Sequence, residues 1–327
     1  SCPPAGEWRR KRSLVVEAGL PAIGQAMNPK PAAAHMPASI APVPHSVGTQ
    51  RPTWALPALA CDSHMHIFDP RFAPSPHWHR QPPDAPVAAY RQLPQRLGTA
   101  RAVVVTPSTY GVDNRCTLDA LAQLNAEGDT ARGVAVVGQD VSPDELAQLA
   151  RQKVCGLRVN FVSPQSWGDT TPAMLQTLAD KVAPLGWHIQ VFMHTEQLLA
   201  HERLLAGLPV PLVIDHMGRV DPAQGEGSAA LAVMLRLLER GRTWVKLSGA
   251  YMRSAHGGPG YADTLPQGCA LVRAAPERLV WGSDWPHTTE PPGTVDDAAL
   301  VDLLAAWCGQ DERRLHAILV DNPARLY

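Results

Sequence analysis

Asp62-Ser63-His64-Met65-His66 closes an apolar run that begins at Leu59, and this stretch decides the fold. His64 and His66 are two residues apart, so a strand would place them on the same face. Near the other end of the chain, a second apolar run closes with Gly282-Ser283-Asp284. Between these motifs, short β-rich runs alternate with stretches of helical pattern. This alternation predicts βαβ units around a parallel sheet.

The alternation supplies enough elements for a closed barrel. Eight strand-like runs are separated by helices whose apolar residues recur every three or four positions. Because a (β/α)8 barrel typically takes about 250 residues, we predict that residues 56–327 form one TIM-type barrel. Strands are expected at 59–66, 102–107, 132–137, 156–161, 188–193, 212–216, 244–248 and 279–283, and helices at 118–126, 143–153, 172–185, 196–205, 229–240, 265–274 and 296–308.

Two segments do not follow the alternation. Residues 1–55 are rich in Pro and Ala and show no apolar periodicity, so we expect a flexible, disordered N-terminal extension without a core of its own. Residues 69–92 form a long loop that contains six prolines. Because long loops in compact domains are usually functional, this loop is predicted to cover the mouth of the barrel.

Composition excludes several classes of protein. The chain of 327 residues has a formal net charge of -1, which gives no reason to expect nucleic acid or a membrane surface as a partner. No run approaches the roughly 20 apolar residues of a membrane-spanning helix. The six cysteines form no Cys-x-x-Cys pair, which favours reduced thiols in a cytoplasmic protein. A small molecule is the expected partner, and the oligomeric state stays open.

Polar residues end or follow six of the predicted strands. In a (β/α)8 barrel the C-terminal strand ends meet at one mouth, where the active site lies. A single histidine there is more often structural than functional, but many inward polar groups together are costly unless they serve one site. The joint pattern therefore predicts a shared site. Its candidate members are His64, His66, Arg158, Asn160, His194, His216, Arg219, Lys246, Ser248, Arg253, Asp284 and His287.

Histidines outside this pattern are given weaker roles. His77 and His79 lie in the long loop, where they can touch substrate. His188 is expected too deep in the barrel to reach the mouth. The others, His35, His45, His201 and His316, are expected at the surface.

Five motifs in order resemble one family over residues 59–327. The chain is similar to the amidohydrolase superfamily, in its amidohydrolase-related branch, which includes 2-pyrone-4,6-dicarboxylate lactonase and muconolactone or sugar-acid lactonases. Residues 1–55 have no counterpart in this resemblance. The motifs are Asp62-Ser63-His64-Met65-His66-Ile67-Phe68-Asp69, Gly156-Leu157-Arg158-Val159-Asn160-Phe161, Ile214-Asp215-His216-Met217-Gly218-Arg219, Lys246-Leu247-Ser248-Gly249 and Trp281-Gly282-Ser283-Asp284-Trp285-Pro286-His287.

The resemblance implies roles for individual residues. His64, His66 and His216 resemble metal-ligating histidines of the superfamily, and Asp284 resembles the acid that takes a proton from the attacking water. Three arginines resemble those that hold substrate carboxylates in the pyrone-dicarboxylate lactonase: Arg158, Arg219 and Arg253. We assign Asn160, Ser108 and His287 to substrate binding as well.

The chain departs from the binuclear members of the superfamily. Those enzymes use a lysine or glutamate on strand 4 and a histidine on strand 5, where this chain offers Arg158 or Asn160 and Gln190. A two-metal centre is therefore not expected. The hypothesis is that no metal is obligatory, or that one divalent ion, Zn or Mn, is held by His64, His66, His216 and Asp284.

These residues favour hydrolysis of a cyclic ester. A carboxylate beside histidines and arginines stays ionised, so Asp284 can act as a base that activates water. Arginines pair with carboxylates, so the expected substrate is a small carboxylated lactone, whether a pyrone, a muconolactone or a sugar lactone. The alternatives are a zinc-dependent decarboxylase of the same superfamily and a non-catalytic barrel that binds a carboxylated metabolite.

Overall fold

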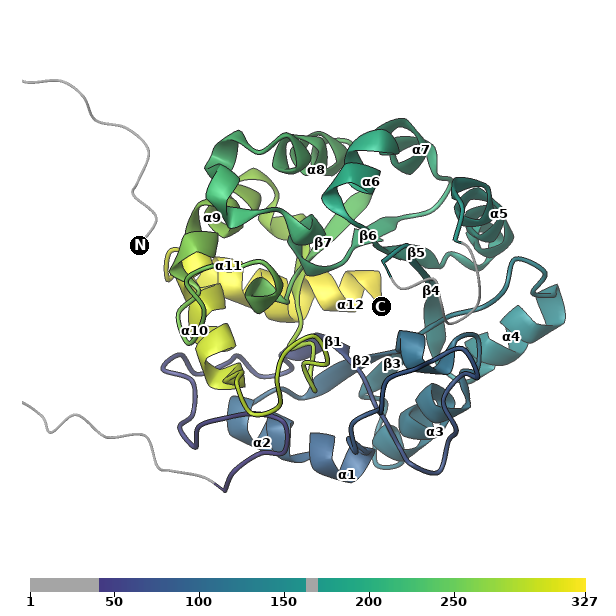
Figure 1. Ribbon diagram of the computed structural model, residues 1–327, viewed down its shortest axis with the longest axis horizontal. Helices are drawn as coiled ribbons and strands as arrows, with labels where there is room; N and C mark the ends of the chain where they lie inside the picture. The colour runs from purple at the N-terminus through teal and green to yellow at the C-terminus, as the bar shows by residue number, and fades with distance from the viewer. Residues whose placement is uncertain (1–40, 163–169) are drawn as a thin grey trace, which may run out of the picture.

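A computed structural model describes residues 41–162 and 170–327 of the chain. Eight parallel strands follow one another around a single sheet in the order in which they occur in the sequence (Figure 1). This is the predicted (β/α)8 barrel, and each strand lies within a few residues of its predicted position. The strands are β1 (Cys61–Met65), β2 (Arg101–Val105), β3 (Ala131–Ala135), β4 (Val154–Asn160), β5 (His188–Phe192), β6 (Leu212–Ile214), β7 (Thr243–Leu247) and β8 (Leu279–Trp281).

The barrel closes between its first strand and the segment that follows its last strand. The Asp284 backbone N–H donates to the carbonyl of His64 at 2.7 Å, and that of His66 donates to the carbonyl of Trp285 at 2.9 Å. Gly282 permits this approach, because a Cβ atom there would lie 2.5 Å from the Cβ of His64. The two motifs that frame the sequence are therefore side by side in space.

A buried carboxylate holds the same seam. Asp62 accepts hydrogen bonds from the Ser283 backbone N–H at 2.9 Å and from the Ser283 hydroxyl at 2.6 Å. It also accepts a hydrogen bond from the hydroxyl of Tyr90 at 3.2 Å. Desolvation by burial raises the pKa of Asp62 to about 6, against the lowering effect of the Ser283 hydrogen bonds.

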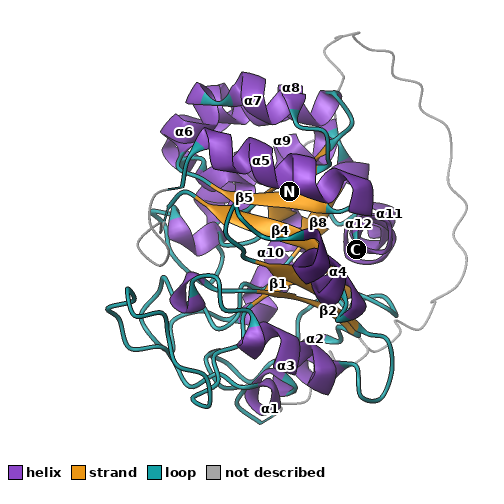
Figure 2. Cartoon of the chain, turned by 90° about the vertical axis from the view of Figure 1, so that its right-hand side faces the viewer, coloured by secondary structure: helices purple, strands orange, loops and turns teal. Residues whose placement is uncertain are grey.

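Helices surround the sheet (Figure 2). Their N-termini follow sequence signals: Ser142 and Glu145 form a capping box, and the Thr171 side chain caps a helix that starts with proline. The helix predicted at 196–205 is interrupted at His201, whose backbone leaves the helical region. The helices are α1 (Val87–Tyr90), α2 (Gln92–Leu97), α3 (Arg115–Leu124), α4 (Pro143–Arg151), α5 (Pro172–Val182), α6 (Thr195–Ala200), α7 (Glu202–Gly207), α8 (Ala229–Glu239), α9 (Leu265–Ala274), α10 (Asp297–Trp307), α11 (Glu312–His316) and α12 (Asn322–Leu326).

The predicted N-terminal extension divides into two parts. Residues 1–40 lie outside the described residues, so their predicted flexibility stays a prediction. Residues 41–55 pack on the barrel, contrary to the predicted boundary at residue 55: buried Arg96 donates to the Ser46 hydroxyl and to the carbonyls of Val47 and Gln50. The indole of Trp285 donates to the carbonyl of Pro44 at 2.8 Å.

The proline-rich loop after β1 is closed at its base. Phe68 and Ala85 exchange two backbone hydrogen bonds, of 3.0 and 2.9 Å, so the loop leaves and rejoins the barrel at one point. Farther along the loop, the Ser75 N–H donates to the carbonyl of Thr109 at 2.8 Å. These bonds fix the loop beside the C-terminal ends of the strands. Among the described residues, no helix has the length and apolar character needed to cross a membrane.

Candidate active site

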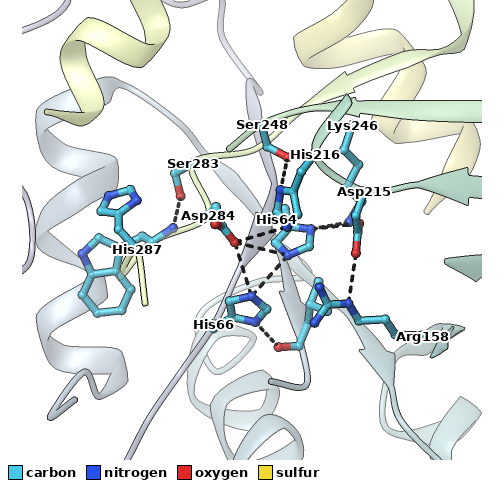
Figure 3. Close-up of polar contacts among 12 residues, drawn as sticks. His64, His66, Arg158, Asp215, His216, Lys246, Ser248, Ser283, Asp284 and His287 are labelled. Carbon is cyan, nitrogen blue, oxygen red and sulfur yellow. Dashed lines mark hydrogen bonds and ion pairs between the residues drawn. The ribbon is translucent and has the colours of Figure 1, made fainter. Parts of the chain in front are cut away.

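Four of the predicted site residues adopt a positive φ: His216, Arg219, Asp284 and His287. His216 lies directly after β6 with a φ of 50°, and Asp284 follows β8 with a φ of 60°. Non-glycine residues rarely adopt positive φ, because the conformation costs on the order of 1–3 kcal/mol. Here it turns both side chains to the centre of the mouth, beside His64 and His66 from the end of β1 (Figure 3).

The four side chains converge on one carboxylate oxygen. The Nε2 atoms of His64, His66 and His216 lie 3.5, 3.4 and 3.8 Å from Oδ1 of Asp284. His64 and His66 also approach each other, with 3.2 Å between their Nε2 atoms. The sequence predicts that these four residues share one site, and the structure places them in one cluster.

Each histidine is held from outside through its other ring nitrogen. Nδ1 of His66 donates to the carbonyl of Val105 at 2.8 Å, and Nδ1 of His216 lies 2.8 Å from the hydroxyl of Ser248. Nδ1 of His64 lies 3.1 Å from Nζ of Lys246 and 3.3 Å from Oδ1 of Asp215. Because every Nδ1 is engaged, all three Nε2 atoms face inward.

These partners decide which nitrogens carry protons. The Val105 carbonyl only accepts, so neutral His66 carries its proton on Nδ1 and presents a bare Nε2. His64 then donates from Nε2 to His66 and accepts from Lys246 at Nδ1. In its other tautomer, His64 would donate from Nδ1 to Asp215 and present a bare Nε2. Its outer partners, one a donor and one an acceptor, therefore support both tautomers.

Asp215 is the buried hub behind His64. Its Oδ2 accepts hydrogen bonds from Nε of Arg158 at 3.0 Å and from Nε2 of Gln190 at 3.1 Å. Burial alone would raise the pKa of Asp215, but the charges of Arg158 and Lys246 and the His64 contact hold it well below its usual range. The strand-4 and strand-5 side chains Arg158 and Gln190 are thus committed in part to this carboxylate.

The interior of the mouth favours the neutral forms of His64 and His216. Burial and the nearby charge of Lys246 lower the pKa of His64 well below its ordinary value, and burial also lowers the pKa of His216. Burial lowers the pKa of Lys246 itself to about 8, although Asp215 opposes this shift. Neutral imidazoles at the centre leave their Nε2 atoms available as ligands or hydrogen-bonding groups.

Asp284 is ionised in this setting. Burial works against its negative charge, but His216 and His64 in their protonated forms, together with the His66 contact, lower the pKa of Asp284 far below its ordinary value. Its second oxygen, Oδ2, accepts a 2.6 Å hydrogen bond from the hydroxyl of Tyr251. Only Oδ1 remains directed at the histidines, so this oxygen is the one available to act as a base.

A buried relay extends from Tyr251 away from the mouth. The Tyr251 oxygen lies 3.1 Å from Nδ1 of His287, and Nε2 of His287 lies 3.1 Å from Oδ2 of Asp297. Burial would lower the pKa of His287, but Asp297 and Asp284 raise it above its ordinary value. A protonated His287 donates to both neighbours, which directs the Tyr251 proton to Asp284.

The cluster has the donor set of a site for one divalent cation. Ligand atoms of His64, His216 and Asp284 all lie within 4.8 Å of one another, and all three residues are buried. Imidazole nitrogen with carboxylate oxygen suits Zn²⁺, and each histidine has the outer hydrogen bond that fixes a ligand ring. Arg158 and Gln190 donate to Asp215 and are not metal ligands. Among the described residues, no second group of ligands for another ion lies beside this one.

A small cavity of about 70 Å³ opens onto the cluster. Three members of the cluster, His66, His216 and Asp284, line it, while His64 is fully buried beneath them. The other lining residues are Phe68, Trp78, Arg80, Pro107, Ser108, Thr109, Arg158, Asn160, Phe192, Met252, Thr288 and Thr289.

Comparison with known proteins places this geometry in a family. A family model described as Amidohydrolase matches residues 61–327. The chain belongs to the amidohydrolase family. It is 36% identical over 288 residues to a 2-pyrone-4,6-dicarboxylate hydrolase from Comamonas testosteroni, across 85% of this chain and 92% of that one.

Two further comparisons agree with this assignment. The amidohydrolase is 34% identical over 280 residues to a 4-sulfomuconolactone hydrolase from Rhizobium radiobacter, across 84% of this chain and 92% of that one. An apo crystal structure of a protein from Agrobacterium tumefaciens superposes with a TM-score of 0.75 at 29% identity, covering 84% of this chain and 98% of that one. Named relatives that match most of the chain include lactone hydrolases and a D-galactarolactone isomerase.

The predicted substrate-binding residues of this amidohydrolase lie in different settings. Arg158, Asn160 and Ser108 line the cavity, and the Asn160 amide donates to the Ser108 hydroxyl at 2.6 Å. Arg219 is half-buried, with its guanidinium 5.2 Å from the ring centroid of Phe192, and it does not line the cavity.

The last two predicted residues also lie outside that lining. Arg253 is exposed, just after the short 3-10 turn Ala250–Met252. His287 is buried, with both ring nitrogens engaged by Tyr251 and Asp297. Its contacts are those of a residue in the relay behind Asp284.

Sequence reasoning did not assign three residues that shape the amidohydrolase site. In the sequence, Asp215 is noticeable only as the neighbour of His216. Tyr251 lies in a predicted loop, and Asp297 lies at the start of a predicted helix. The long loop was predicted to cover the mouth, and Trp78 and Arg80 from that loop line the cavity. The two loop histidines singled out from the sequence, His77 and His79, are exposed and do not line it.

Proposed function

We propose that this amidohydrolase opens a lactone that bears a carboxylate or a similar anionic group. The observation that carries the proposal is the ionised Oδ1 of Asp284, which faces three histidines within 3.8 Å at the edge of the cavity. A carboxylate held this way is a base at neutral pH. The relatives support the choice of substrate, because their names give a pyrone dicarboxylate and a sulfonated muconolactone.

In the proposed reaction, Asp284 activates water. Oδ1 takes a proton while the water oxygen forms a bond to the lactone carbonyl carbon. The ring C–O bond then breaks, and Asp284 returns the proton to the leaving enol or alkoxide oxygen. Water is added and no other reactant is needed, so the product is the ring-opened acid.

The neighbouring residues would stabilise and orient this reaction. His216 lines the cavity, and its Ser248 partner can donate to Nδ1, which leaves a proton on Nε2 for the carbonyl oxygen. Removing one such oxyanion donor commonly costs about 3 kcal/mol of transition-state stabilisation. Arg158 keeps its terminal nitrogens for a substrate carboxylate, since only its Nε is bound to Asp215.

One divalent cation, bound by His64, His66, His216 and Asp284, supplies Lewis acidity at the carbonyl oxygen when it is present. The buried donor set fits such an ion, as the three inward Nε2 atoms indicate. This fit also favours a second candidate, a zinc-dependent decarboxylase. That reaction needs the ion to bind the carboxylate that is lost, so it should stop completely when the ion is removed.

A turnover screen separates these possibilities. Metal-free protein is assayed with 2-pyrone-4,6-dicarboxylate, muconolactone and aldonolactone acids, and again after zinc or manganese is added. Ring opening without loss of CO2, abolished in Asp284→Asn, is the expected result. Release of CO2 that depends on the ion would favour the decarboxylase, and binding without turnover would favour a non-catalytic barrel. Near wild-type hydrolysis by Asp284→Asn would remove Asp284 as the base.

A further inference from the structure

The loop after β1 brings an aromatic residue and a cation to the cavity. Trp78 and Arg80 both line the space in front of Asp284, although they lie about 200 positions before it in the chain. Their positions are fixed locally: the Trp78 N–H donates to the carbonyl of Ser75 at 2.9 Å, and the Ser75 N–H donates to the carbonyl of Thr109. The loop therefore presents these two side chains from a defined backbone.

The polar groups of the pair are not committed elsewhere. Nε1 of Trp78 is buried and has no hydrogen-bond partner within the described part of the chain. The Arg80 guanidinium stacks 4.8 Å from the ring centroid of Trp78, and among residues 41–162 and 170–327 it forms no ion pair. A buried N–H normally finds an acceptor, and an exposed guanidinium without a carboxylate partner is open to an anion.

Trp78 and Arg80 also line a second cavity beside the site. A neighbouring cavity of about 270 Å³ shares five lining residues with the site cavity: Phe68, Trp78, Arg80, Thr109 and Thr288. Its lining contains one carboxylate, that of Glu290, together with His45 and His287. A substituent that leaves the site cavity on this side meets the Trp78 and Arg80 pair.

Arg158 alone cannot serve a substrate with two anionic groups. It lines the cavity near His216, but its Nε is bound to Asp215, and its charge is partly balanced by that carboxylate. A second anionic substituent therefore needs another positive group, and Arg80 is the other arginine in the lining.

We infer that Trp78 and Arg80 form a second anion subsite that binds an oxyanion substituent of the substrate. The indole N–H donates to one oxygen, and the guanidinium, held flat against the indole, binds the same group. This inference rests on the proposed function, and it adds a recognition pair for substrates that carry two anionic groups. The subsite selects among lactones and takes no part in bond breaking.

The kinetic test compares two substrates that differ by one carboxylate. Steady-state constants are measured with 2-pyrone-4,6-dicarboxylate and 2-pyrone-6-carboxylate for Arg80→Met and for Trp78→Phe, which keeps the ring and removes the N–H. Arg80→Met should raise the KM for the dicarboxylate at least about tenfold with little change in kcat, and Trp78→Phe should raise it severalfold. The KM for the monocarboxylate should change much less. The matched control is Arg91→Met, because Arg91 is exposed and donates to the carbonyl of Gln123 away from the cavity.

A binding measurement keeps this inference separate from the proposed function. Calorimetric titration with pyridine-2,4-dicarboxylate, which has no ester to hydrolyse, should show weaker binding for Arg80→Met than for the wild type and Arg91→Met. That result supports the subsite even if no lactone is turned over. Equal KM changes for both pyrones, or unchanged pyridine-dicarboxylate binding in a variant whose thermal midpoint matches the wild type, would overturn it. A sulfonated lactone with the same dependence on Arg80 would show that the subsite recognises the oxyanion rather than the carboxylate alone.

Discussion

The hydroxyl of Tyr251 donates a 2.6 Å hydrogen bond to Oδ2 of Asp284, the oxygen opposite the one that faces the three histidines. This bond fixes the carboxylate so that only Oδ1 is presented to the cavity. Tyr251 is itself held by His287 and, through it, by Asp297. The orientation of the base therefore depends on a chain of groups that do not touch substrate.

Replacing Tyr251 by Phe should lower kcat about tenfold and leave KM nearly unchanged, because Asp284 keeps its charge but loses its fixed orientation. Steady-state kinetics across pH would also show the acid limb moving to higher pH, since the carboxylate loses a donor that favours its ionised form. Tyr261→Phe is the control, with its ring centroid 6.3 Å from that of Tyr251. An unchanged kcat and pH profile in Tyr251→Phe would contradict the orienting role.

Gly282→Ala should destabilise the barrel at its seam. The added Cβ would lie 2.5 Å from the His64 Cβ and 2.6 Å from the His64 backbone nitrogen, so β8 and β1 must separate. Overpacking of this kind costs about 1–3 kcal/mol or more of unfolding free energy, measurable by urea denaturation. Gly207→Ala is the control, because a Cβ there meets no atom within 4 Å. Equal midpoints for the two variants would show that the seam tolerates the methyl group.

Asp62 gives a pH dependence of stability with an unusual sign. Its pKa rises from 3.8 to about 6 on folding, so the folded protein binds this proton more tightly than the unfolded chain does. The cost of burying the charge is absent below about pH 4 and complete above about pH 6. At about 1.4 kcal/mol per pH unit, this amounts to roughly 3 kcal/mol.

The measurement compares wild type with Asp62→Asn, which does not ionise. Unfolding free energies at pH 4, 5, 6 and 7 should show the wild type losing stability relative to the variant as pH rises through this window. Subtracting the two curves cancels the titration of every other group. A difference that stays constant, or that grows in favour of the wild type with rising pH, would contradict the raised pKa.

Asp215→Asn should weaken zinc binding about 10- to 100-fold, because the ring of His64 loses its outer carboxylate partner. Competition with a coloured chelator measures this affinity without any assay of activity, and one equivalent of zinc is expected for the wild type. Asp140→Asn is the control, since Asp140 is exposed and does not line the site cavity. Equal affinities for the two variants, or no zinc bound by the wild type, would count against the proposed cation site.

The fold could be predicted because its signals are local. Each strand and helix is marked by its own apolar period, and caps such as Ser142 with Glu145 fix helix starts within a few residues. The start of the ordered domain could not be predicted in this way. Residues 41–55 carry little apolar pattern and are held by polar contacts to Arg96, which lies about 50 positions farther along the chain.

The central residues of the site could be predicted for the same reason. The residues that hold them in place could not. Each of the four central residues ends or follows an apolar run that predicts a strand: His64, His66, His216 and Asp284. In a barrel, the C-terminal ends of the strands lie together at one mouth. Tyr251 and Asp297 depend on loop paths after β7 and β8 that no period describes. The positions of Trp78 and Arg80 depend on the backbone hydrogen bond from Ser75 to Thr109. The proline-rich sequence of the loop does not predict this bond.

The closure of the barrel also sets the moment at which this protein first becomes active in a cell. Asp62 and Ser283 meet at the seam although 221 positions separate them, so the ribosome must synthesise all of the residues between them before the two motifs can pair. At about 5–20 residues per second, His64 and His66 wait on the order of ten to forty seconds for Asp284. A nascent chain therefore has no activity until its last strand has emerged and docked against its first.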